Sequence, residues 1–164
     1  MTEQEFVAAA DACIAVSKVA VGTADPKWQP GRDPDELRLK LPLEINGELS
    51  GSYLLVMTYP DHHNLKFRLC VELYDKVIDR LDFDPDESHA NSAGFGNLIE
   101  GPHWHSWNDN RHLSGSVTKY DKLRIAVPFA EARKFDAALR WYCHRVNIVL
   151  GQHGIDFPPR QKLI

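Results

Sequence analysis

The stretch that decides the fold is ELRLKLPLEI at residues 36–45. Leucine or isoleucine stands at every second position from Leu37 onward, and the positions between carry polar residues or proline. Side chains of a β-strand point alternately to its two faces, so this pattern indicates a strand with one apolar face. Pro42 cannot donate to a strand ladder, which suggests a sheet edge or an interrupted ladder.

The residues that follow predict an antiparallel meander over 36–84. Asn46-Gly47 is a strong hairpin signal, and SYLLVMTY after it has the composition of the returning strand. A second alternating run, KFRLCVEL, leads through a turn at Asp75-Lys76 into VIDRLDF. The simplest reading is four strands in up-and-down order.

Both ends of the chain have helical patterns. We predict a helix over 1–21, because Thr2 and Glu5 form a capping-box pattern and apolar residues then recur at helical spacing. A second helix is expected over 129–150, where an apolar stripe runs along one face.

The remaining segments are a proline-rich connector at 22–35, a sheet region at 36–128 and a tail at 151–164. Helices at both ends of a strand-rich middle define an α+β fold. We therefore expect a single domain, 1–164, built as a curved antiparallel sheet (a meander) with the N-terminal and C-terminal helices packed on it.

Composition places the chain among ordinary globular proteins. Of its 164 residues, 43% are hydrophobic and 26% charged. No window approaches the roughly 20 apolar residues of a membrane span, and the N-terminus lacks a basic signal-peptide region. The three cysteines are far apart in apolar settings, which favours free thiols. We expect a cytoplasmic protein without membrane contact.

The net charge of −4 hides an asymmetry between the two parts of the chain. Residues 1–110 hold 9 basic and 19 acidic side chains, whereas residues 111–164 hold 10 and 4. A basic C-terminal segment can bind nucleic acid, or it can pack on the acidic body of the same chain. Both interpretations stay open from the sequence.

Histidines gather in GPHWHSWNDNRH at 101–112, directly after a polar loop at 84–101. Long ordered loops inside compact domains are often functional. If the segment around His103 and His105 is extended, the two imidazoles project from one face while Trp104 points to the core. Such a pair can bind one metal ion when a third ligand joins it. His89 is the expected third ligand, and Asp82, Asp84 and His112 are further candidates.

The histidine cluster supports three interpretations. His89, His103 and His105 could hold a divalent transition metal, zinc or manganese, that activates water. In a metal-free alternative a histidine such as His105, paired with Asp82 or Asp109, acts as general base, and Arg111 or His112 contacts a phosphate. The rings could also form only structural hydrogen bonds at a strand end.

The segment LDFDPDESHAN…GNLIEGPHWH resembles a family of small uncharacterised bacterial and phage proteins. Its pattern runs from a Leu-Asp strand end through a His-x-Asn loop to a Gly-Pro-His-x-His strand. The matching residues here are Leu81, Asp82, His89, Asn91, Gly101, Pro102, His103 and His105. The resemblance covers about residues 66–112 and implies a shared fold and polar pocket. A weaker likeness is to small toxins of toxin–antitoxin modules.

Two function classes follow. The first is a small hydrolase of phosphodiester bonds, such as a toxin-like ribonuclease, with its centre at His103 and His105. The second is a non-catalytic interaction module: an antitoxin, a phage accessory protein or a defence-system component. In that role the chain would bind a protein partner or form a homodimer. The sequence does not decide whether the protein is an enzyme.

Overall fold

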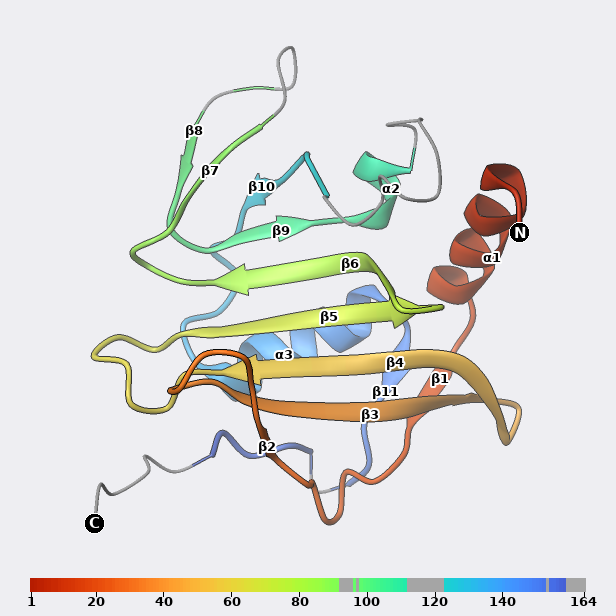
Figure 1. The fold of residues 1–164 in the computed structure, drawn as a ribbon, viewed down its shortest axis with the longest axis horizontal. Helices are drawn as coiled ribbons and strands as arrows, with labels where there is room; N and C mark the ends of the chain where they lie inside the picture. Colours follow the sequence, from red (N-terminus) through yellow and green to blue (C-terminus); the bar gives the residue numbers. More distant parts are fainter. Residues whose placement is uncertain (92–95, 97, 112–122, 153, 159–164) are drawn as a thin grey trace.

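The computed structural model describes residues 1–91, 96, 98–111, 123–152 and 154–158 of the chain. It has an α+β fold with one large sheet that does not close on itself, as Figure 1 shows. Except for one parallel pair, the strand pairs of this sheet are antiparallel. The predicted fold class is therefore confirmed at this level. In the described part of the chain, no helix is long and apolar enough to cross a membrane.

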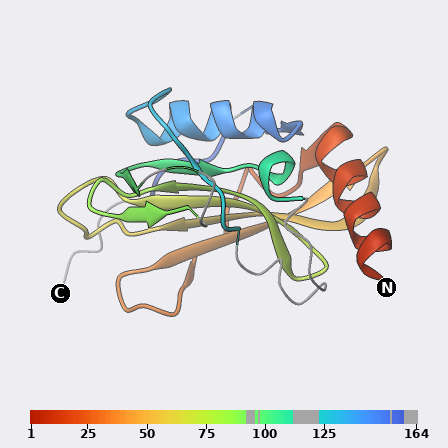
Figure 2. The same cartoon turned by 90° about the horizontal axis from the view of Figure 1, so that it is seen from above.

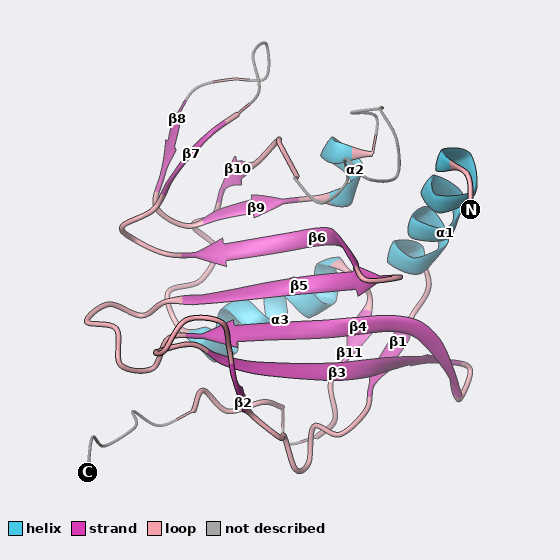
Figure 3. Cartoon of the chain, viewed as in Figure 1, coloured by secondary structure: helices cyan, strands magenta, loops and turns pink. Residues whose placement is uncertain are grey.

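Short and long strands together form the sheets (Figure 3). The large sheet has the strand order β10-β9-β6-β5-β4-β3-β1-β11, with β2 paired to β3, and β7 and β8 form a separate hairpin. The strands are β1 (Lys18–Ala20), β2 (Gln29–Pro30), β3 (Leu37–Ile45), β4 (Glu48–Thr58), β5 (Phe67–Leu73), β6 (Lys76–Phe83), β7 (Ser88–Ala90), β8 (Leu98–Glu100), β9 (His103–His105), β10 (Val127–Pro128) and β11 (Ile148–Val149).

The meander from β3 to β6 follows the predicted order, and its turns use the expected residues. Asn46 and Gly47 both have positive φ, as a tight hairpin turn that matches the twist of the strands requires. The next hairpin turn uses Tyr74 and Asp75, one residue before the predicted position. The ladder between β3 and β4 shifts register between Pro42 and Glu44, at the proline that cannot donate.

Three helices accompany the sheet: α1 (Glu3–Ala15), α2 (Trp107–Asn110) and α3 (Phe135–Arg145). Figure 2 shows α3 lying across one face of the sheet, with α1 at the end of the molecule. Phe6 of α1 and Leu139 of α3 are buried in the same apolar core as Leu54 and Leu69 of the central strands. The predicted capping box of α1 is present, with the Thr2 side chain and the Glu5 side chain each accepting from the other's backbone N–H.

Three segments differ from the predicted boundaries. The first helix ends at Ala15, and Lys18–Ala20 is a strand, because the buried Lys18 ammonium donates to backbone carbonyls at the ends of α1 and α3. The loop at 84–101 contains the β7–β8 hairpin. The helix predicted over 129–150 spans only Phe135–Arg145, followed by the edge strand β11, which pairs with β1.

The two faces of the sheet have different roles. Trp104 of β9 packs edge-on against Trp141 of α3, so it lies on the face that α3 covers. Because side chains alternate along a strand, His103 and His105 lie on the opposite face. The site described below therefore lies on the face that is turned away from α3.

Candidate metal centre

The strand register brings the polar side chains of this face into two cross-strand rows. In the first row Arg68 of β5 is the partner of Asp82 of β6, which in turn is the partner of His103. In the second row Arg80 of β6 is the partner of His105. Directly opposed residues on one face of a sheet have Cβ atoms about 5 Å apart, so these side chains must interact.

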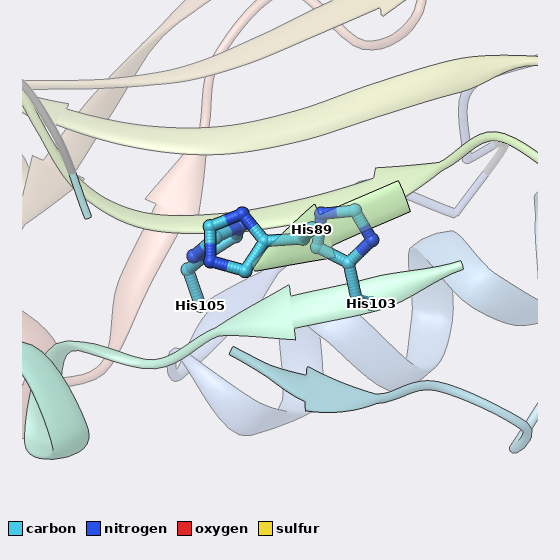
Figure 4. Close-up of side chains that lie close together, drawn as sticks. All are labelled: His89, His103 and His105. Atoms are coloured by element: carbon cyan, nitrogen blue, oxygen red, sulfur yellow. The ribbon is translucent and has the colours of Figure 1, made fainter. Parts of the chain in front are cut away.

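Three histidines meet above these rows. His103 and His105 come from β9, and His89 comes from β7 of the separate hairpin, as Figure 4 shows. The ring centroid of His89 lies 5.3 Å from that of His103 and 4.6 Å from that of His105. One ring nitrogen of each histidine lies within 4.8 Å of the other two, a spacing at which they could hold one metal ion. The predicted convergence of these three residues is present.

Hydrogen bonds to backbone carbonyls fix which nitrogen of each ring carries a proton. His103 Nδ1 lies 2.8 Å from the Gly101 carbonyl oxygen, and His105 Nδ1 lies 3.1 Å from the Ile125 oxygen. His89 Nε2 lies 3.1 Å from the Arg124 oxygen. A carbonyl only accepts, so each of these nitrogens must donate. Each neutral ring then keeps one lone pair on its other nitrogen, which is the arrangement that metal-binding histidines have.

Two asparagines hold the segment that supplies two of these carbonyls. The Asn110 side chain accepts from the backbone N–H groups of Arg124 and Ile125, and donates to the Ile125 oxygen. From the other side, the Asn91 side chain accepts from Ala126 N–H and donates to the Ala126 oxygen. Residues 124–126 are therefore fixed although they form little regular structure, and the carbonyls keep the orientation that the rings of His89 and His105 need.

Gly101 shapes the entry into β9. Its φ is +76°, in the left-handed region that favours glycine, and its N–H donates to the Glu87 carbonyl at 2.8 Å. The same turn directs the Gly101 carbonyl to the His103 ring. A side chain at this position would strain the turn and move the hydrogen bond that sets the ring orientation.

Asp82 is the acidic centre of the site and is almost fully buried. Arg68 Nε contacts its Oδ1, and Arg80 Nε lies 2.7 Å from its Oδ2. Burial acts to raise the pKa of the Asp82 carboxyl, but its contacts with His103 and His105 and the charges of Arg80 and Arg68 hold that pKa well below its ordinary value. Asp82 is thus a carboxylate, not a carboxylic acid.

The two histidines of β9 have opposite electrostatic environments. Burial lowers the pKa of His105 to about 4, and the charge of Arg80 adds to that effect. For His103, burial also acts to lower the pKa, but the neighbouring Asp82 carboxylate and the hydrogen bond to the Gly101 carbonyl raise it overall. His105 is therefore neutral at pH 7, with a lone pair available on Nε2.

The distances around Asp82 fit a metal ion. Its Oδ2 lies 3.5 Å from His103 Nε2 and 3.3 Å from His105 Nε2. In a tetrahedral zinc site with bonds of about 2.1 Å, two ligand atoms lie about 3.4 Å apart. Although buried, Oδ2 receives no well-directed hydrogen bond from any described residue. An oxygen that is placed at ligand distance and left without such a bond fits a carboxylate ligand.

His103 and His105 are closed off from solvent, His89 is half-buried, and Asp82 lines a neighbouring pocket. The side chain of His105 is 0% exposed and that of His103 is 1% exposed. A pocket of about 390 Å³ opens beside them, and Asp82 is part of its wall. Its other lining residues are Tyr59, His62, Lys66, Phe67, Arg68, Asp84, Asp86 and Glu87.

Two further groups of possible ligands exist: Asp82, Glu87 and His103 form one that shares His103 with the cluster, and the other lies outside the buried site. His62, His63 and Asp86 also bring one ligand atom each within 4.8 Å of the others. Two of the three are exposed, and exposed groups of this kind are common without a metal ion. The buried cluster at His89, His103 and His105 is therefore the stronger candidate for a metal site.

The other predicted site residues are Arg111, His112 and Asp84. The Arg111 guanidinium contacts Asp11 of α1, and among the described residues it makes no hydrogen bond or ion pair with the three histidines. Its predicted contact with a phosphate stays a prediction. His112 lies outside the described residues. Asp84 binds Lys66 at 2.7 Å on the wall of the pocket.

Sequence reasoning missed Arg80, Arg68 and Asn110. Arg80 and Arg68 are strand residues in alternating runs, where arginine usually marks a solvated face. Only the register, which pairs Arg80 with His105 and Arg68 with Asp82, reveals their roles. For Asn110, no signal in the sequence indicates that its buried side chain forms a hydrogen bond with a residue 15 positions later.

Comparisons with protein-family models, curated proteins and solved structures gave no significant match to this chain. The case for function therefore depends on the geometry of the site itself.

Proposed function

We propose that the protein is a metal-dependent hydrolase whose centre is a divalent transition-metal ion, zinc or manganese, bound by His89, His103 and His105. The observation that carries the proposal is the set of hydrogen bonds behind the rings. Each imidazole gives one N–H to a backbone carbonyl and so keeps its other nitrogen for a ligand bond. Three histidines at one ion are also a common ligand set of catalytic zinc sites.

Asp82 completes the proposed centre. Its buried Oδ2 is at ligand distance from two of the histidine nitrogens, so it serves as a fourth ligand or as the hydrogen-bond acceptor that orients a metal-bound water. When bound, the metal would lower the pKa of a coordinated water to about 7 and supply hydroxide near neutral pH. Asp82 is ionised, so it can accept a hydrogen bond from that water.

The negative charge of the pocket next to Asp82 means that an anionic substrate could bind there only with a metal ion present. Its wall contains two basic residues, Lys66 and Arg68, against four carboxylates, Asp82, Asp84, Asp86 and Glu87. A pocket with this excess of negative charge repels a phosphodiester unless a divalent cation offsets the two extra carboxylates. We therefore propose phosphodiester hydrolysis that depends strictly on metal, and the charge balance disfavours the metal-free ribonuclease mechanism.

The test is hydrolysis of bis(p-nitrophenyl) phosphate and of single-stranded RNA by protein purified without a histidine tag. Activity should be present with Mn²⁺ or Zn²⁺, absent with a chelator, and reduced at least about 100-fold in His103→Ala. The matched control is His144→Ala, which removes an exposed histidine from α3. A metal-loaded wild-type protein that cleaves neither substrate would exclude this reaction.

A structural metal site is the second candidate, and the burial of His103 and His105 favours it. Structural zinc sites are closed by four protein ligands, and Asp82 with the three histidines makes four. In this role the ion would fasten the β7–β8 hairpin, through His89, onto the large sheet. A metal-loaded protein that is stabilised by the ion but inactive would support this candidate. It would leave the chain as the interaction module that the sequence also allows.

The partners predicted from the sequence stay proposals. Two of the basic residues of α3 already have partners: Arg140 pairs with Asp136, and Arg145 lies over the rings of Trp104 and Trp141. Arg140 stays largely exposed, so it can still contact a nucleic acid. Filter binding of RNA by Arg140→Gln, compared with wild type, tests the basic C-terminal segment as a nucleic-acid surface.

A further inference from the structure

Arg80 lies where the proposed metal would bind. Its Nη2 is 2.9 Å from His105 Nε2, and its Nε is 2.7 Å from Asp82 Oδ2. His105 belongs to the proposed metal centre, and Asp82 is the carboxylate beside it. The guanidinium therefore contacts two of the proposed ligand atoms at once.

Because of the tautomer of His105, the metal ion and the Arg80 guanidinium cannot both contact this ring. Its Nδ1 donates to the Ile125 carbonyl, so Nε2 is the only lone pair of the neutral ring. In the structure that lone pair accepts from Arg80. A nitrogen with one lone pair cannot bind a metal ion and accept a hydrogen bond together. A metal at His105 thus requires Arg80 to leave.

The contact between Arg80 and Asp82 is close but poorly directed. Despite the 2.7 Å separation, neither Arg80 Nε nor Asp82 Oδ2 forms a well-directed hydrogen bond with any described residue. The Arg80 guanidinium offsets the charge of the buried Asp82 carboxylate but forms no well-directed hydrogen bond to its Oδ2. A cation held in this way can be replaced by one that fits better, because charge compensation is kept while few directed bonds are lost.

We propose that Arg80 is a built-in counter-ion that occupies the site in place of the metal, and that metal binding releases it to bind an anionic group of the substrate. The inference rests on the proposed metal centre. It adds that Arg80 controls metal binding and that the substrate carries a negative charge. Once displaced, the guanidinium stays tethered beside the ion with its donors free. Guanidinium groups bind phosphate oxygens with two parallel hydrogen bonds. Metal and phosphate should therefore bind with positive coupling through Arg80.

The experiment is titration of Mn²⁺ into the metal-free protein, with and without inorganic phosphate, followed by calorimetry and by the electron paramagnetic resonance signal of free Mn²⁺. Arg80→Gln removes the competing charge, so its Mn²⁺ affinity should rise about tenfold over wild type. In wild type, phosphate should tighten Mn²⁺ binding about tenfold, and Arg80→Gln should lose this coupling. The matched control is Arg140→Gln, an exposed arginine of α3 that should leave both values unchanged.

Each outcome decides one of the two proposals. Equal Mn²⁺ affinity in wild type and Arg80→Gln, with phosphate coupling the same in both, overturns the role of Arg80 and leaves the metal centre standing. Absence of Mn²⁺ binding from both proteins overturns the metal centre itself. If Arg80→Gln fails to fold, as judged by circular dichroism, the wild-type titration still decides: absence of coupling between Mn²⁺ and phosphate overturns the inference.

Discussion

Asp82 of β6 and His103 of β9 are direct cross-strand partners, and their side chains meet with Oδ2 and Nε2 3.5 Å apart. The contact is built by strand register alone, because Asp82 and His103 are 21 positions apart in the sequence. Strands β6 and β9 are central and near-edge elements of one sheet, so the acidic and imidazole groups have fixed positions. A site on paired strands is positioned more rigidly than one on loops.

Asp82→Asn should destabilise the protein by about 3 kcal/mol. The change leaves the charges of Arg68 and Arg80 without their carboxylate, and breaking a buried ion pair costs about 3–5 kcal/mol. We expect the low end of this energy range because the guanidinium groups of Arg68 and Arg80 are partly exposed, so water can solvate them when the carboxylate is lost. Urea unfolding measures the loss. Asp136→Asn is the control: its pair with Arg140 is exposed, so the free energy of unfolding should change by less than about 0.5 kcal/mol. Equal effects of the two changes would contradict the central role of Asp82.

Asn110→Ala should weaken metal binding about 10- to 100-fold although Asn110 binds no metal. Its side chain holds Ile125 and Arg124, whose carbonyls orient His105 and His89, and loss of such outer contacts typically costs that much affinity. Competition with a chelating dye measures the affinity. Asn108→Ala, an exposed position in the same short helix, should bind metal like wild type. An unchanged affinity in Asn110→Ala would show that the carbonyls do not set the ring orientation.

The metal-free protein should lose stability through His105 as the pH falls from about 6.5 to 4. Burial lowers the pKa of His105 to about 4 in the folded state, whereas an unfolded histidine has a pKa of about 6.5. Between these values the unfolded chain binds a proton that the folded site rejects, so the free energy of unfolding falls as pH falls. Asp79, whose pKa burial raises to about 7, acts in the opposite direction over this range.

The contribution of His105 is therefore measured as a difference. With a chelator present, the unfolding free energies of wild type and His105→Gln should diverge with pH, and between pH 4 and 6.5 the slope of the unfolding free energy against pH should be more positive in wild type. His144→Gln provides the control on an exposed ring. Parallel profiles for wild type and His105→Gln would contradict a neutral, buried His105.

Much of the fold could be predicted from the sequence because local patterns and the final structure agree there. The alternation of Leu37–Ile45, the Asn46-Gly47 turn and the Thr2–Glu5 capping box all appear as expected. The end of α1 could not be predicted. The run after Ala15 is compatible with a helix, and it becomes a strand because Lys18 reaches the Val146 carbonyl, 128 residues away.

For the site, the sequence indicated the ligands but not their environment. His103 and His105 could be placed on one face from their spacing, and His89 and Asp82 were candidates by composition. Arg80 could not be placed beside His105, because that contact needs the register of β6 against β9. The depth of burial was also beyond the sequence: a strand end with two histidines gives no sign that a hairpin covers them.

Metal should stabilise the folded protein through the β7–β8 hairpin. In the proposed centre His89 is the ligand from this hairpin, so a bound ion would link the hairpin to β9 of the large sheet. A ligand at 1,000 times its dissociation constant stabilises the state that binds it by about 4 kcal/mol. Thermal unfolding with Zn²⁺ and with a chelator measures the shift. His89→Ala should abolish it, and an identical melting temperature with and without Zn²⁺ would contradict the link.

The most direct test of the metal centre is the amount of Zn²⁺ bound per chain in protein purified without a histidine tag, reconstituted and measured by inductively coupled plasma mass spectrometry. The three-histidine site predicts one ion per chain in wild type and in His144→Ala, and a loss of that ion in His89→Ala, His103→Ala and His105→Ala. A wild-type protein that retains no ion after reconstitution, or variants at these three positions that all retain one, would contradict the account.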